Sequence, residues 1–135
     1  MRGLIHHLDL TVTIMQRSIR FYDLVLSELG YKRERAYEGD VPVWMYENNV
    51  GIVFSIGLHL SKENSTHDRY KPGLHHLAFS AESANEIDDF YEFLNKNEVE
   101  ILDPPAKYDY TPGYYAVFFK DPDGLKLEVA YEPKI

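Results

Sequence analysis

The 135-residue sequence contains no cysteine. This absence excludes disulfide bonds, thiolate metal sites and a cysteine nucleophile. Basic residues are also scarce, because 14 lysines and arginines stand against 22 aspartates and glutamates, a formal net charge of −8. An acidic surface argues against nonspecific binding to nucleic acid or to an anionic membrane.

Long apolar runs are missing as well. The longest, around residues 50–58, is too short to span a bilayer. The first residues show no apolar stretch of the kind that marks a secretory signal. The length suits one domain that can bury a core without disulfides. We therefore expect a single cytoplasmic globular domain, residues 1–135, that binds neither nucleic acid nor membranes.

The sequence does contain an internal repeat. His-His pairs at 6–7 and 75–76 align at an offset of 69 residues, and Gly51–Ser55 aligns with Gly124–Glu128 at an offset of 73 residues. The repeat predicts two modules joined by a polar linker. The predicted ranges are about 1–60 for module one, about 61–73 for the linker and about 74–135 for module two.

Each module is predicted to run strand, helix and then further strands. Gly30 is a natural helix stop, and Ser83-Ala-Asn-Glu86 is a capping-box pattern that predicts the start of a second helix ending near Asn97. Asp121-Pro-Asp-Gly124 is typical of a turn between two strands. The strands are predicted at residues 4–12, 43–47, 51–60, 74–81, 114–120 and 125–131.

The predicted strands alternate between an apolar face and a second face. That second face holds histidine, serine, threonine, alanine and glycine instead of the lysine and glutamate of an ordinary solvent surface, which indicates a lined cavity. By the same alternation, His6 and His75 are predicted to point towards the helices as partly buried structural histidines.

His7, His76 and Glu128 stand out on the second face. Two neutral imidazoles and a carboxylate can hold one divalent metal ion and leave positions open for water or substrate. Such a set accepts Zn, Ni, Mn, Fe or Co, so the sequence predicts one divalent metal ion without naming it. His59, on the same predicted face as Ser55, is the candidate catalytic base.

These motifs resemble the vicinal oxygen chelate superfamily, which includes glyoxalase I, methylmalonyl-CoA epimerase, extradiol dioxygenases, fosfomycin-resistance transferases and bleomycin-resistance proteins. The matching segments are His7–Val12, Ser18–Tyr22, His76–Phe79 and Asp121–Glu128. The resemblance implies an α+β fold in which two tandem βαβββ modules form an open, eight-stranded, barrel-like sheet around a metal site. It also implies a homodimer.

The resemblance implies a metal-dependent, glyoxalase-like enzyme acting on a small molecule that chelates the metal through vicinal oxygens. A lyase or isomerase is favoured. In glyoxalase I and the epimerases a fourth protein ligand stands where this chain has Ser55. The extradiol and fosfomycin groups use three ligands, but usually carry a tyrosine where this chain has Phe118.

An extradiol-type dioxygenase and a fosfomycin-type thiol transferase are therefore alternatives. A metal-free small-molecule-binding protein is an alternative of another class. The predicted substrate contacts are Asp9, Ser55, Tyr115 and Phe118.

Overall fold

The computed structural model describes residues 2–34 and 41–134, which fall into two compact units, Met1–Ser65 and Thr66–Ile135. We call them the N-terminal unit and the C-terminal unit. The boundary between them lies within the segment predicted to be a linker, residues 61–73. None of the described helices is long and apolar enough to cross a membrane.

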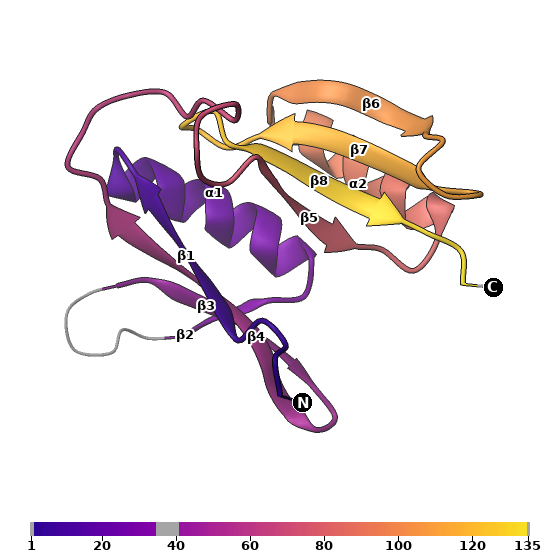
Figure 1. Cartoon of the computed structure of the whole chain (residues 1–135), viewed down its shortest axis with the longest axis horizontal. Coiled ribbons are helices and arrows are strands. Elements are labelled where there is room, and N and C mark those ends of the chain that lie inside the picture. Colours follow the sequence, from indigo (N-terminus) through magenta and orange to yellow (C-terminus); the bar gives the residue numbers. More distant parts are fainter. Residues whose placement is uncertain (1, 35–40, 135) are drawn as a thin grey trace. The chain divides into compact units, whose positions relative to one another are not determined.

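The N-terminal unit is a four-stranded mixed sheet with one helix (Figure 1). The strand order is β1-β4-β3-β2; β1 runs parallel to β4, and the other neighbours are antiparallel. Its elements in chain order are β1 (His7–Val12), α1 (Met15–Glu28), β2 (Lys32–Glu34), β3 (Val43–Asn48) and β4 (Gly51–Leu60).

The C-terminal unit repeats this topology with strand order β5-β8-β7-β6, again with its first and last strands parallel. Its elements are β5 (His76–Ser80), α2 (Ala84–Lys96), β6 (Ile101–Lys107), β7 (Tyr115–Lys120) and β8 (Lys126–Tyr131). The α+β fold with two βαβββ modules is therefore confirmed. The expectation of one barrel-like sheet was too specific, because the described strands form two separate four-stranded sheets.

Local sequence signals explain where the helices end. Gly30 adopts a φ of 97° after α1, a left-handed conformation that glycine reaches without steric cost. At the start of α2, the Ser83 hydroxyl accepts a hydrogen bond from Glu86 N at 3.2 Å, and the Glu86 carboxylate accepts one from Glu82 N at 2.7 Å. The predicted capping pattern at Ser83 is confirmed, and the helix reaches Lys96 as expected.

Two strands were missed. β2 has only three residues, all exposed and charged, so it shows no alternation between apolar and polar side chains. β6 contains Pro104 and Pro105, and its pairing with β7 shifts register between Ile101 and Ala106. Because proline breaks the regular pairing of a strand, sequence alternation could not identify β6.

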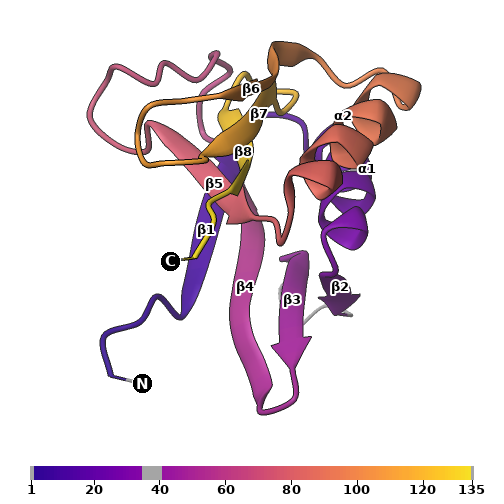
Figure 2. The same cartoon turned by 90° about the vertical axis from the view of Figure 1, so that its right-hand side faces the viewer.

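Each unit packs its helix on one face of its own sheet; Figure 2 shows α2 alongside its sheet. In the C-terminal unit, apolar side chains of β7 and β8 fill this side with three buried residues of α2. The participants are Val117, Phe119, Leu127, Val129, Ile87, Phe90 and Leu94. The opposite face of each sheet is left for polar residues, as the predicted alternation requires.

A tight turn leads into β8. The carboxylate of Asp121 accepts hydrogen bonds from Asp123 N at 2.9 Å and Leu125 N at 2.8 Å, and Gly124 N donates to Asp121 O at 3.0 Å. Asp121 is itself buried. The predicted turn is confirmed, and it sets the start of the strand that carries Glu128.

Candidate functional site

The C-terminal unit brings His76 of β5 and Glu128 of β8 together. His76 Nε2 lies 3.2 Å from Glu128 Oε1, while the Glu128 side chain is only 3% exposed. In the parallel ladder His76 pairs with Lys126 and Ala78 pairs with Glu128, so the imidazole reaches its partner diagonally across the two strands. A buried carboxylate needs such partners, because it has lost its contact with water.

Tyr114 supplies the second partner of Glu128. Its hydroxyl donates a hydrogen bond to Glu128 Oε2 and leaves Oε1 facing His76. Burial raises the pKa of Tyr114 well above its usual value, and the hydrogen bond to Glu128 raises it further. Tyr114 therefore stays protonated and continues to donate across the physiological pH range.

His75 holds the other side of the His76 ring. The two Nδ1 atoms are 2.7 Å apart, a hydrogen-bond distance, so one ring donates and the other accepts. Loss of solvation lowers the pKa of His75, and the nearby charges of His76, Lys126, Arg69 and His67 lower it further. A neutral His75 can accept a proton from His76 Nδ1, which leaves His76 Nε2 as the ligating atom.

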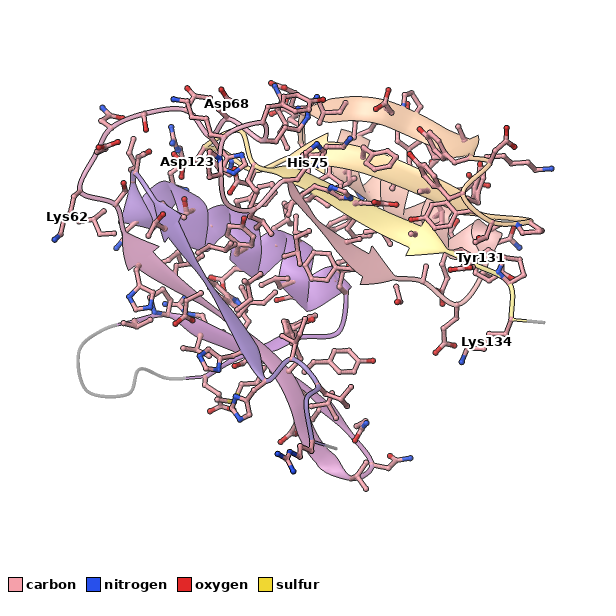
Figure 3. The ribbon with its side chains drawn as sticks, in the orientation of Figure 1. Lys62, Asp68, His75, Asp123, Tyr131 and Lys134 are labelled. Carbon is pink, nitrogen blue, oxygen red and sulfur yellow. The ribbon has the colours of Figure 1, made fainter. Side chains whose placement is uncertain are left out.

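The N-terminal unit repeats this arrangement at its own histidine pair. His6 Nδ1 and His7 Nδ1 are 3.0 Å apart, with the two rings edge to face. The prediction that His6 and His75 are partly buried structural residues is wrong, because both are exposed and precede their strands. Figure 3 labels His75 at the start of β5. Strand alternation does not apply before the strand begins, and each pair instead fixes one imidazole against its neighbour.

Phe118 and Lys126 complete the surroundings of His76. Phe118 pairs with Glu128 in the ladder, and its ring centroid lies 6.5 Å from that of His76. Lys126 Nζ lies 4.4 Å from the centroid of the Phe118 ring. The carboxylate and imidazole are thus bordered by an apolar ring and a cation.

The geometry of the His76–Glu128 pair fits a divalent metal. Two donor atoms that each lie about 2.1 Å from one ion are about 3.0 Å apart at a right angle and about 3.4 Å apart at a tetrahedral angle. The observed 3.2 Å lies between these values. Over residues 2–34 and 41–134, however, no group of three or more histidine, aspartate or glutamate side chains is gathered that could hold a metal. The pair supplies two of the three predicted ligands.

A second acid–histidine pair lies in the N-terminal unit. His59 Nε2 of β4 is 3.1 Å from Asp9 Oδ2 of β1, and both side chains are exposed. Gly57 pairs with Asp9, and a Cβ atom at Gly57 would lie only 2.5 Å from Asp9 Oδ1. The missing side chain at Gly57 therefore makes room for the Asp9 carboxylate.

The strand register corrects the alignment of Ser55 with Glu128. His7 pairs with Ser55, but His76 pairs with Lys126, so Ser55 corresponds in the ladder to Lys126. The position that corresponds to Glu128 is Gly57, two residues further along β4. The cause is the connection between the last two strands, which spans only residues 49–50 in the N-terminal unit and residues 121–125 in the C-terminal unit.

The structure also corrects the choice between two adjacent tyrosines. The Tyr115 hydroxyl donates to Asp88 of α2 at 2.6 Å, on the helix-facing side of the sheet. This hydrogen bond is the largest cause of the raised pKa of Tyr115. Tyr114, one residue earlier, shares the face of Phe118 and Glu128. The alternation along 114–118 was the signal that could have identified Tyr114 as the residue at the site.

Comparison with known sequences gives relatives over nearly the whole chain. The chain is 34% identical over 131 residues to the uncharacterized protein YqjT of Bacillus subtilis, covering 92% of this chain and 95% of that protein. It is 30% identical over 126 residues to the metallothiol transferase FosB of Staphylococcus haemolyticus, covering 93% of this chain and 81% of the relative.

Solved structures show the same fold. A Bacillus halodurans structure, provisionally assigned as a glyoxalase, has a TM-score of 0.80 at 26% identity and covers 97% of both chains. A glyoxalase/dioxygenase from Nostoc punctiforme has a TM-score of 0.73 at 24% identity, covering 98% of this chain and 92% of the other. The family model of this group matches residues 4–129, a range that contains both histidine pairs and Glu128. On these grounds the chain belongs to the Glyoxalase/Bleomycin resistance protein/Dioxygenase superfamily.

Proposed function

We propose that this protein is a metal-dependent, glyoxalase-like enzyme that acts on a small molecule with two vicinal oxygens. His76 and Glu128 supply two ligands of one divalent ion, and His7 supplies the third. The observation that carries the proposal is the His76–Glu128 pair at 3.2 Å, whose outer atoms are already held by His75 and Tyr114. Ligands held in this way are typical of metal centres.

A bound divalent ion would polarise a substrate carbonyl. The chain's own residues prepare the ligands for that role. Tyr114 fixes the Glu128 carboxylate through Oε2, and His75 fixes the ring of His76 through Nδ1. Phe118, which is almost fully buried, covers the base of the site and excludes water from Glu128.

The proposed proton-accepting group is His59. Asp9, 3.1 Å away, orients its imidazole and stabilises the protonated form. Asp9, Ser55 and Phe118 remain the proposed substrate contacts, and Tyr114 takes the place of Tyr115. Proton transfer next to a carbonyl, a lyase or isomerase reaction, asks only for these groups and the ion.

Thiol transfer is the second candidate, because the chain is 30% identical to a metallothiol transferase. Phe118 separates the two candidates in part. The resemblance places a tyrosine at this position in the fosfomycin group, whereas here the ring has no hydroxyl and packs against Lys126 and Tyr108. This difference makes us rank proton transfer above thiol transfer.

The metal assignment is tested by the metal content of purified protein. We expect about one divalent ion per chain in the wild type and a clear loss in His76→Ala. His59→Ala removes a histidine outside the ligand set and should retain the ion. Equal metal content in wild type and His76→Ala would refute the metal assignment.

The reaction class is tested by NMR. In D₂O, metal-loaded protein should accelerate exchange of the carbon-bound proton of an α-hydroxyketone, and chelator should abolish this acceleration. Consumption of a small thiol in the presence of fosfomycin, without proton exchange, would favour the second candidate instead.

The homodimer implied by the resemblance also stays a proposal. Light scattering of the full chain at several concentrations measures it directly. A mass of one chain at all concentrations would contradict it.

A further inference from the structure

Arg69 and His76 are connected through ring contacts in the C-terminal unit. The Arg69 guanidinium carbon lies 5.2 Å from the Tyr70 ring centroid, and the Tyr70 ring meets the His75 ring edge to face at 5.3 Å. His75 in turn contacts His76 through the paired Nδ1 atoms. This series of contacts brings a permanent cation to one side of His76.

Lys126 lies on the other side. It is the ladder partner of His76 and lies over the Phe118 ring, which is edge to face with His76. Arg69 and Lys126 therefore border the same imidazole from a loop and from a strand. The lowered pKa of His75 has loss of solvation as its largest cause, and Lys126 and Arg69 both lower it further through their charges.

Neither cation has a carboxylate partner in the part of the chain that the structure describes. Among the ion pairs of residues 2–34 and 41–134, none involves Arg69 or Lys126, and Arg69 Nε is buried without a hydrogen-bond partner there. The nearest acid identified in this site, Glu128, already pairs with Tyr114 and His76. In a chain with a net charge of −8, two such cations beside the same imidazole indicate that an external anion completes the site.

We propose that Arg69 and Lys126 bind an oxyanion of the substrate, a carboxylate or a phosphoryl group, next to the ligand His76. The planar guanidinium would take two oxygens of the anion, and the ammonium group would act as a point charge. The inference rests on the proposed function for the identity of the ligand as substrate. It adds that the substrate carries a negative group beside its chelating oxygens.

The experiment uses the full chain, freed of metal by chelator and dialysis, and follows backbone NMR signals during titration with inorganic phosphate or with acetate. We expect saturable shifts at Arg69, His75 and Lys126. Arg69→Gln and Lys126→Gln should each weaken binding by about tenfold. A tighter response to phosphate than to acetate would identify the phosphoryl class, and the reverse the carboxylate class.

Lys96→Gln is the matched control, because it removes the same charge from the exposed end of α2. If it weakens binding as much as Lys126→Gln, the effect is general charge attraction and the proposal is overturned. Shifts that do not saturate with either anion also overturn it. Unchanged spectra outside the site verify that each variant is folded.

Metal content measured on the same samples separates this inference from the proposed function. Saturable anion binding in a wild-type protein that takes up no metal would leave the anion site standing and refute the metal centre. Normal metal uptake without anion binding would do the opposite.

Discussion

The two units each carry an acid–histidine pair of almost the same length in opposite surroundings. Asp9 and His59 are 3.1 Å apart and each 45% exposed, whereas His76 and Glu128 are 3.2 Å apart with Glu128 only 3% exposed. Distance alone therefore does not distinguish an ordinary surface contact from a prepared ligand set. The environment does, because exposed ion pairs contribute only about 0–1 kcal/mol.

The pairs also differ in which strand carries the acid. In the N-terminal unit the carboxylate is on the first strand and the histidine on the last; in the C-terminal unit the order is reversed. Gly57 makes this exchange understandable. It stands where the C-terminal unit has Glu128, and the space of its missing side chain holds the carboxylate of Asp9.

A repeat that keeps its topology can thus assign different chemistry to equivalent positions. The C-terminal pair has a tyrosine and a second histidine that fix its geometry, as a metal ligand set requires. The N-terminal pair stays solvated and suits a group that exchanges protons. Matched substitutions in the two units can test this division.

The largest expected effect is at Glu128. Glu128→Gln keeps the shape of the side chain but removes a negatively charged ligand, so we expect metal affinity to fall by more than about 100-fold. Asp9→Asn, the matching change in the other unit, should alter it little. Competition with a metal-sensitive dye measures both. If the two variants bind metal equally, the proposed division between the pairs is wrong.

Tyr114 gives the next largest effect. Tyr114→Phe removes the hydrogen bond to Glu128 Oε2 while keeping the ring, and we expect metal affinity to fall by about 10- to 100-fold, as for other partners that orient a ligand. Tyr115→Phe is the control, since its hydroxyl bonds to Asp88 instead. A loss of metal affinity in the Tyr115 variant alone would restore the sequence-based choice.

Sequence patterns predicted most of the fold for identifiable reasons. The repeat indicated the two modules, Gly30 and the Ser83 capping box indicated helix ends, and Asp121 indicated the turn before the last strand. β2 and β6 escaped because one is three charged residues and the other contains two prolines. Neither leaves the alternation from which a strand can be inferred.

The candidate site was predictable only in part. Alternation put His76 and Glu128 on one face, and the structure brings them together. Alternation could not show that Glu128 is buried, that His75 contacts His76 through Nδ1, or that Tyr114 faces the carboxylate. These facts depend on side-chain directions at positions before the strands begin. The two-residue difference in register was hidden because an alignment does not show hairpin length.

The third prediction concerns alkaline pH. The pKa of Tyr114 is raised in the folded protein, first by burial and then by Glu128, while an unfolded tyrosine titrates near ~10. Its contribution to stability is therefore complete below about pH 10 and is lost as the pH rises towards the folded value. Between about pH 9 and 11, wild type should lose about 1 kcal/mol more than Tyr114→Phe. Urea unfolding at each pH measures the difference; parallel curves for the two proteins would show that Tyr114 is not buried against Glu128.

The smallest expected effect is at Gly57. Gly57→Ala places a Cβ 2.5 Å from Asp9 Oδ1, so the carboxylate must turn away from its position beside His59. Because the obstructing atom ends a short, exposed side chain, the cost in unfolding free energy should be only about 0.5–1 kcal/mol. The same substitution in an Asp9→Ala background should cost less, since the clash is gone. The double-mutant cycle, measured by urea unfolding, isolates the coupling between the two positions. Additive effects would mean that Gly57 does not make room for Asp9, and the missing side chain at Gly57 would then no longer explain why acid and histidine exchange strands between the two units.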